Sequence, residues 1–212
     1  MPKILVADDE THILNVVSLK LRNAGFEVIT GLDLDKRGFD IKVRDFARAE
    51  LWPHAAQWDR EHHFPREELR EAAAMGLFGV AIPEQWGGAG MDATSLAIAC
   101  EEISAGDGAT GTILAVNNLV AGILNGFASD AQKREWLPKL LSGEIVGAHA
   151  ITEPGAGSDV FSLTSRAEQR EGGYVLNGQK TFSTNSPVAG LALAFAYVQR
   201  ENQKPALTAF LV

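Results

Sequence analysis

The stretch ITEPGAGSDV, residues Ile151–Val160, follows the point at which the sequence changes from a helical to a β-rich pattern. Gly155 and Gly157 carry no side chain, so backbone N–H groups here can approach a flat or anionic ligand closely. The hydroxyl groups of Thr152 and Ser158 add hydrogen-bond donors. A plain connecting turn is the alternative interpretation, because Gly and Pro are common in loops of every kind.

A second stretch, NGQKTFSTN at Asn177–Asn185, favours a binding role for the first. It offers an aromatic ring at Phe182 and hydroxyl groups at Ser183 and Thr184, and its pattern predicts a short strand. Because side chains alternate along a strand, we expect Phe182 and Thr184 on the same side. Together the two stretches suit a planar heteroaromatic cofactor with a phosphate tail.

The sequence upstream of these stretches is helical in pattern from residue 36 to about residue 143. Pro53 interrupts the first helix, which we expect it to kink or restart. Gly76 ends the second helix, and Ser129 with Gln132 predicts a capping box for the last. The predicted helices span residues 43–63, 64–76, 93–104, 110–127 and 129–143.

After Gly143 come short β-rich segments separated by Gly, Pro and Asn, which are typical of an antiparallel β domain. Residues 1–31 have the pattern strand, helix, strand. The predicted fold class is therefore α+β. It comprises a β-α-β extension at 1–32, an all-α domain at 33–144, and an antiparallel β domain at 145–212 that we expect to be incomplete.

The composition is that of an ordinary soluble globular protein, with 46% apolar and 22% charged residues among 212. A net charge of −8 argues against nucleic acid or an anionic membrane as the main partner. The apolar run Leu191–Val198 is too short to span a membrane, and the N-terminal run is too short for a signal peptide.

A single cysteine, Cys100, excludes an internal disulfide and fits a reducing compartment, so we expect a cytoplasmic protein with a buried, inert thiol. No metal site is predicted at the histidines of the first helical region, which lack a Cys or ordered carboxylate partner: His54, His62 and His63.

Four pieces of the sequence, in this order and spacing, resemble the acyl-CoA dehydrogenase family. They cover about residues 36–212 and match a helical N-terminal domain followed by a β middle domain. The pieces are RDFARAELWPHAAQWDREHHFPREELREAAAMGLFGVAIPEQWGGAGMD, SDAQKREWLPKLLSGE, AITEPGAGSD and NGQKTFSTN. The resemblance implies an FAD enzyme that removes hydrogens from the α and β carbons of an acyl thioester.

The resemblance also implies roles for residues of the first stretch. Ile151 and Thr152 would line the pyrimidine side of the flavin. Gly157 and Ser158 would approach the FAD pyrophosphate, with Ser158 near the thioester substrate as well.

In the second stretch, Phe182 takes the place of an aromatic residue, usually Trp, that packs on the flavin. Phe keeps a π face but lacks the indole N–H. Ser183 would share the contact with the cofactor, and Thr184 takes the place of a hydroxyl that donates towards flavin N5. A fixed donor there stabilises negative charge as N5 receives the hydride.

Removal of the α proton needs a general base, which in the family is a carboxylate on a C-terminal helical domain. The chain ends at Val212 within the β domain, so we expect that domain to be absent and assign no catalytic residue. Glu153 is expected to order its loop as an acceptor, and His149 to pack in the core. The implied partners are an acyl-CoA or acyl carrier protein thioester and an electron-transfer flavoprotein. Further copies of the chain are a third expected partner, since an incomplete sheet exposes a strand edge.

Residues 1–31 resemble the opening β-α-β unit of a response-regulator receiver domain. Asp8 and Asp9 match the acidic pair that binds Mg²⁺ there, but the later phospho-accepting Asp has no counterpart. We interpret this segment as a fusion remnant rather than a working phosphorelay. A receiver-type signalling module and a non-catalytic flavin-binding or interaction fragment remain as alternative functions.

Overall fold

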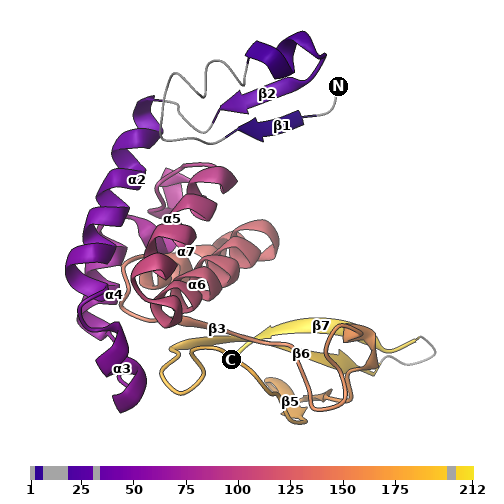
Figure 1. Ribbon diagram of the computed structural model, residues 1–212. Helices are drawn as coiled ribbons and strands as arrows, with labels where there is room; N and C mark the ends of the chain where they lie inside the picture. Colours follow the sequence, from indigo (N-terminus) through magenta and orange to yellow (C-terminus); the bar gives the residue numbers. More distant parts are fainter. Residues whose placement is uncertain (1–2, 7–18, 31–33, 200–203) are drawn as a thin grey trace.

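A helical domain followed by a β domain makes up most of the computed structural model, which confirms the predicted fold class (Figure 1). Asp8 and Asp9, the candidate metal ligands of the N-terminal segment, lie outside the described residues. The structure describes residues 3–6, 19–30, 34–199 and 204–212.

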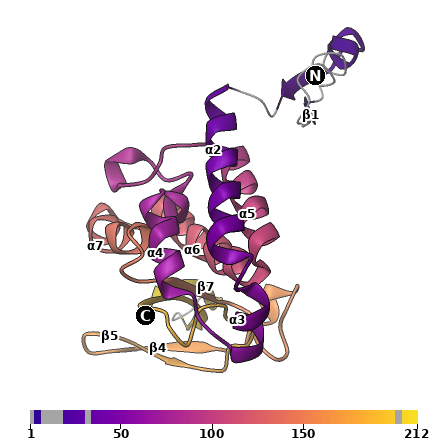
Figure 2. The same ribbon diagram turned by 60° about the vertical axis from the view of Figure 1, so that its left-hand side comes forward.

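The N-terminal segment contains a parallel pair of short strands, β1 (Lys3–Val6) and β2 (Glu27–Thr30). Residues 19–23, ahead of β2, are helical, and Gly25 makes the turn into the strand with a φ of 85°. Figure 2 shows this unit standing apart from the helices, near the start of α2.

The helical domain packs its helices around two apolar clusters. Its longer helices are α2 (Leu34–Phe46), α4 (Arg66–Ala74), α5 (Ala93–Gly106), α6 (Gly108–Phe127) and α7 (Asp130–Leu141). Its shorter ones are the π-helical turn η1 (Ala47–Leu51), α3 (Ala55–Glu61), and the 3₁₀ turns η2 (Leu77–Gly79) and η3 (Glu84–Trp86).

Local chemistry explains where several of these helices begin and end. The helix that starts with α2 and η1 stops before Pro53, which has no N–H to donate, and the chain restarts as α3. Asp107 ends α5 and caps α6, accepting a hydrogen bond from the Thr110 amide at 2.8 Å. Ser129 and Gln132 form the predicted capping box at the start of α7.

The central helix is α6, which packs against α5, α7 and the first strand of the β domain. It is long and apolar enough to cross a membrane by length and composition alone, but 50% of its apolar window is buried inside the fold. Two of its buried residues are polar, Asn117 and Asn118. Asn118 accepts a hydrogen bond from the Val80 amide and donates to the Leu77 carbonyl, so it ties the α4–α5 connector to the helix.

The β domain is a mixed sheet with strand order β3-β6-β4-β5 and with β7 on the other side of β6. β3 and β4 run parallel to β6, whereas β5 pairs antiparallel to β4 and β7 antiparallel to β6. The prediction of a purely antiparallel sheet was therefore wrong, because residue patterning identifies strands but does not encode the direction of their neighbours. The elements are β3 (Gly147–Ala150), the 3₁₀ turn η4 (Val160–Ser162), β4 (Arg166–Arg170), β5 (Gly173–Asn177), β6 (Leu191–Val198) and β7 (Ala206–Leu211).

The two domains meet where β3 passes under α6. A Cβ atom at Gly147 would lie 2.9 Å from a methyl carbon of Val120, so only glycine allows this close approach. The Gly147 amide donates to Asn117 Oδ1 at 2.9 Å. Asn117 in turn donates to the Leu140 carbonyl at 3.2 Å, so one side chain joins α6, α7 and β3.

Candidate functional site

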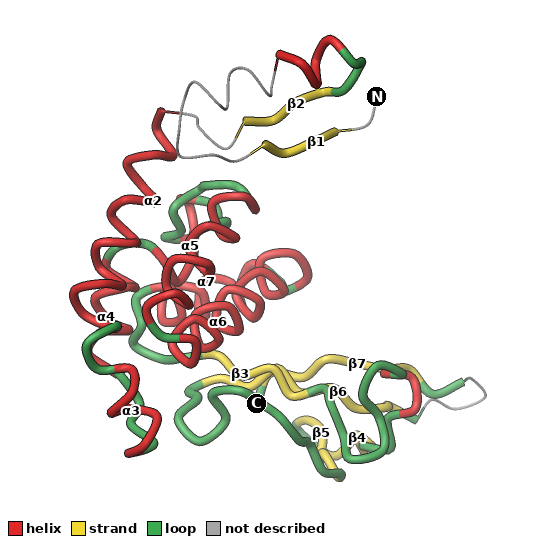
Figure 3. The backbone as a smooth tube through the Cα atoms, viewed as in Figure 1, coloured by secondary structure: helices red, strands yellow, loops and turns green. Residues whose placement is uncertain are grey.

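Two loops emerge from the sheet at this junction, and they contain all the residues that the sequence predicts for the cofactor site. The first loop, residues 151–159, follows β3. The second loop, residues 178–190, joins β5 to β6 and reaches towards α3 (Figure 3). Within the first loop, the Glu153 and Ala156 amides donate to each other's carbonyls at 2.9 and 3.1 Å, which closes a tight turn.

Backbone and side-chain hydrogen bonds hold the two loops against each other. The Thr181 amide donates to the Thr152 carbonyl at 2.9 Å, and Lys180 Nζ donates to the Ile151 carbonyl at 3.1 Å. The structure therefore brings the Ile151–Thr152 segment next to the residues that lead into Phe182.

Glu153 orders the first loop as expected, and its carboxylate is the centre of the contact between the loops. One of its oxygens accepts from the Thr164 amide and hydroxyl at 2.6 and 2.7 Å. The other accepts from the Ser165 amide at 3.0 Å and from Lys180 Nζ at 2.8 Å. Burial opposes ionisation, but the hydrogen bonds from Lys180, Ser165 and Thr164 outweigh it and hold the pKa of the Glu153 carboxyl far below its usual range.

The stretch KTFSTN is not the short strand that the sequence predicts. It forms an irregular loop with left-handed backbone at Phe182, where φ is 54°, and at Asn185, where φ is 70°. The argument that strand alternation places Phe182 and Thr184 on one side was therefore wrong. The side chain of Asn185 replaces strand pairing here, because its Nδ2 donates to the Gly147 carbonyl at 2.9 Å.

The second loop presents groups that fit a bound aromatic cofactor. Phe182 is 94% exposed, so its ring has an open face. Thr181 Oγ1 and Ser183 Oγ are buried without a hydrogen-bond partner, although buried hydroxyl groups are normally paired. Thr184 is half-buried beside them. These unpaired hydroxyl groups are what a site for a polar ring system leaves open.

The outer part of the first loop is exposed at residues 157–159. Gly157 and Ser158 both lie on the surface. A Cβ atom at Gly155 or Gly157 would have no neighbour within 4 Å, so this backbone is open to an approaching ligand. The functional roles of Gly157 and Ser158 stay predictions.

An apolar hollow of about 490 Å³ lies beside Thr184, between the second loop, the start of α6 and the turn after α3. Ile113, Phe64, Pro187 and Val188 supply much of its lining.

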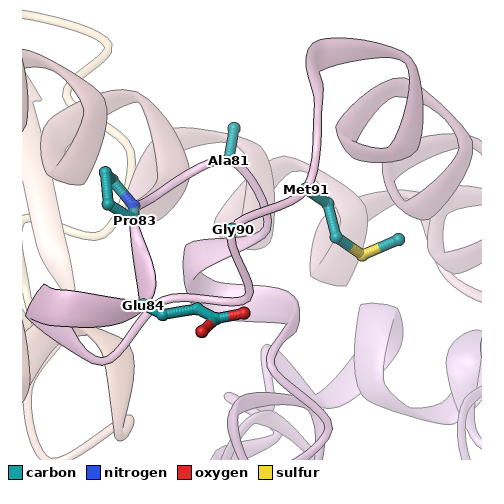
Figure 4. A pocket seen from close by; sticks show the side chains of 5 residues that line it. All are labelled: Ala81, Pro83, Glu84, Gly90 and Met91. Carbon is teal, nitrogen blue, oxygen red and sulfur yellow. The ribbon is translucent and has the colours of Figure 1, made fainter.

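A separate hollow of about 470 Å³, shown in Figure 4, lies on the α4–α5 connector and shares no residue with the two loops. Its lining residues are Ala81, Pro83, Glu84, Gly90 and Met91.

The remaining candidate residues have structural contacts. His149 is half-buried and packs edge-on against Phe195, and burial lowers its pKa. Cys100 is half-buried rather than fully buried, and burial raises the pKa of its thiol. Among the described residues, no group of three His, Cys, Asp or Glu side chains could hold a metal ion. The rings of His54 and His63 both stack with the ring of Trp58, at centroid distances of 5.4 and 5.6 Å.

Sequence reasoning missed two residues that shape the site, Lys180 and Asn185. Both lie inside the quoted stretch NGQKTFSTN, next to the residues assigned to the cofactor. A lysine in a segment with few other charges was the available signal for Lys180. Asn185 gives no such signal, because its role depends on the position of Gly147 in a different strand.

Comparisons with known proteins agree with this architecture. Residues 35–144 match the acyl-CoA dehydrogenase N-terminal domain, and residues 148–212 match the acyl-CoA dehydrogenase middle domain. A helical domain and a mixed sheet with two loops at their junction thus define the class, and the chain belongs to the acyl-CoA dehydrogenase family.

Individual relatives are longer proteins that match most of this chain. The mitochondrial short-chain specific acyl-CoA dehydrogenase of Homo sapiens is 43% identical over 170 residues, which cover 80% of this chain and 41% of the relative. The glutaryl-CoA dehydrogenase of Desulfococcus multivorans is 40% identical over 81% of this chain and 45% of its own length. The chain thus spans less than half the length of these relatives.

Solved structures show the same fold. A glutaryl-CoA dehydrogenase in complex with glutaryl-CoA superposes with a TM-score of 0.80 at 37% identity, covering 85% of this chain and 47% of that one. A glutaryl-CoA dehydrogenase from Mycobacterium smegmatis in complex with FADH2 gives a TM-score of 0.79 at 31% identity, covering 85% of this chain and 46% of its own.

Proposed function

We propose that this chain forms the flavin-contacting part of an FAD-dependent dehydrogenase that acts on the α and β carbons of an acyl thioester. The observation that carries the proposal is the junction of the two loops. Hydrogen bonds from Thr181 to Thr152 and from Lys180 to Ile151 bring together the two segments that the family resemblance assigns to the flavin. The unpaired hydroxyl groups of Thr181 and Ser183 support a polar ligand at this place.

The protein's part in the reaction is to bind and orient. FAD, when bound, supplies the hydride acceptor. Thr152 and its backbone would hold the pyrimidine side of the flavin, the exposed ring of Phe182 would pack on it, and the Thr184 hydroxyl would donate towards N5. The open backbone at Gly157 and Ser158 would contact the pyrophosphate.

The substrate and partners follow from the family and belong to the proposal. The apolar hollow beside Thr184 would receive the acyl chain of a thioester carried by coenzyme A or an acyl carrier protein, and its apolar lining supports this role. The general base would come from a C-terminal domain of the kind found in the family. An electron-transfer flavoprotein would accept the electrons, in a homo-oligomeric, cytoplasmic enzyme.

The N-terminal segment suggests no second activity. The parallel pairing of β1 with β2 supports the likeness to the opening of a receiver domain. We propose that it is an appended structural unit without phosphorelay activity. Incubation with acetyl phosphate should therefore give no acid-labile phosphoaspartate on the chain, and labelling would contradict this part of the proposal.

The first test is the visible absorption spectrum of the purified chain after incubation with FAD and desalting. We expect a retained flavin band. Phe182→Ser should weaken retention, because it removes the ring that packs on the flavin. Phe161→Ser is the matched control, since Phe161 is 75% exposed in the same domain but lies outside both loops. A folded chain without a flavin band would contradict the proposal.

A further inference from the structure

The pair formed by Glu153 and Lys180 is the most buried of the ion pairs described in this structure. Their side chains are 2% and 17% exposed, and the atoms of the bond are 2.8 Å apart. By contrast, the pair of Arg170 with Glu168 in the adjacent hairpin is 65% and 53% exposed. A buried charge is costly unless it is paired and hydrogen-bonded, so a pair at this place needs an explanation.

Hydrogen bonding fully supports the pair. The carboxylate accepts from the Thr164 amide and hydroxyl, the Ser165 amide and Lys180. Lys180 uses a second N–H on the Ile151 carbonyl. The ionised state of Glu153 is therefore strongly favoured, and the pair carries no net charge.

The position of the pair links it to the site. Lys180 lies two residues before Phe182 and four before Thr184 along the second loop. Its contact with Ile151, together with the bond from Thr181 to Thr152, sets the separation of the two loops. A change in the pair would therefore move the flavin-facing segments relative to each other.

Resting on the flavin site proposed above, we infer that Glu153 and Lys180 are positioning residues for that site. The pair sets the spacing between the Thr152 and Thr184 segments, and its zero net charge sets the electrostatic potential at the pyrimidine side of the flavin. Both residues act through the loops and neither is assigned a catalytic role.

The two halves of the pair predict opposite electrostatic effects. Glu153→Gln leaves an uncompensated ammonium group near the flavin, and a cation favours the addition of electrons. Lys180→Met leaves an uncompensated carboxylate near the flavin, and an anion disfavours the addition of electrons. A loss of packing alone would not give opposite signs.

The experiment compares the full chain with Glu153→Gln, Lys180→Met, the double variant and Lys180→Arg. FAD affinity is measured by quenching of flavin fluorescence. The reduction potential of the bound flavin is measured at about pH 8 by equilibration with a dye of known potential. Each single variant should bind FAD about tenfold more weakly or worse, since one partner of a buried pair is left alone. Glu153→Gln should make the flavin easier to reduce and Lys180→Met harder. The double variant should return towards the wild-type potential, and Lys180→Arg should retain it.

Glu168→Gln is the matched control, because it makes the same chemical change in an exposed pair of the same domain. Circular dichroism and thermal melting check folding, and Glu153→Gln, which keeps the size of the side chain, decides the question if Lys180→Met fails to fold. FAD bound by the wild type, with both single variants shifted alike or not at all, would overturn the positioning role and leave the proposed function standing. A folded wild-type chain that retains no FAD would overturn both.

Discussion

Asn117 shows how much a single buried residue can hold together. Its side chain is fully buried, accepts from the Gly147 amide and donates to the Leu140 carbonyl. The Leu140 carbonyl also accepts from the Gly143 amide at 3.4 Å, so the asparagine adds a second bond at the end of α7 and holds an amide of β3 in the other domain.

Asn117→Leu should therefore destabilise the chain by about 1–3 kcal/mol, because it removes the buried hydrogen bonds of this side chain to the Gly147 amide and the Leu140 carbonyl. Urea denaturation followed by circular dichroism measures the change. Asn125→Leu, at a half-buried position of the same helix, is the control and should have a smaller effect. Equal losses in the two variants would argue against the hydrogen-bonding role.

Glu153 should make stability depend on acid pH. Its carboxyl has a lower pKa in the folded chain than its ordinary value of 4.5, so the folded chain binds fewer protons than the unfolded one. The contribution is fully present above that ordinary value and is lost as the pH falls towards the folded pKa.

At neutral pH, Glu153→Gln should cost on the order of 3 kcal/mol, since it leaves Lys180 without its partner. The difference in the free energy of unfolding between this variant and the wild type should become smaller below about pH 4.5. Unfolding by urea at a series of pH values measures it, with Glu168→Gln as an exposed control expected to change little. A gap that is constant from neutral to acid pH would contradict the prediction.

Residue identity alone predicted Glu153 as a loop-ordering acceptor, which its hydrogen bonds confirm. The cofactor-binding roles of Thr152, Phe182 and Thr184, which chemical type also suggested, stay predictions. The bonding partners of Glu153 could not be predicted, because Thr164 and Lys180 reach it from separate segments. The left-handed backbone at Phe182 could not be predicted either, because an aromatic residue rarely adopts this conformation and the local sequence pattern does not indicate it.

At the scale of elements, helix α6 contains glycines with opposite roles. A Cβ atom at Gly111 would lie 2.9 Å from the Ser104 Cα atom, because α5 and α6 cross closely there. At Gly122 the same atom would meet nothing within 4 Å.

Gly111→Ala should therefore destabilise the chain by about 1–3 kcal/mol through overpacking. Gly122→Ala should stabilise it by about 0.5–1 kcal/mol, because alanine is the better helix former and has room. Thermal melting of the two variants against the wild type measures both. The same sign for both substitutions would show that the close helix crossing does not decide the outcome.

The predictions of helix boundaries are confirmed where they depend on residues that are neighbours in the sequence. The break at Pro53 and the capping box of Ser129 and Gln132 depend on neighbouring residues, and both are confirmed. The mixed sheet was missed because β6 takes its direction from β3 and β4, which are distant in sequence. The irregular form of KTFSTN was missed because its anchor is the side-chain bond from Asn185 to β3.

At the scale of the whole molecule, the sheet has open edges. Among the described strands, β5 pairs only with β4 and β7 only with β6. Val175 of β5 is 47% exposed. Unpaired strand edges with apolar side chains favour association with another chain.

We therefore expect concentration-dependent self-association of this chain in sedimentation velocity. Val175→Lys should reduce it, because a charged residue opposes pairing of edge strands. Leu119→Lys is the control, since Leu119 is 46% exposed on α6, away from the sheet edge. A monomer at all concentrations would contradict the prediction.

Gly147 gives the junction between the domains a further property. Asn117 of the helical domain holds its N–H, and Asn185 of the second loop holds its C=O. Thr184 is next to Asn185 in the chain, so its position is linked through Gly147 to the helical domain as well as to the sheet. The Gly147 amide proton should accordingly exchange with deuterated solvent only when the domains separate, which makes it a reporter of how often they do so.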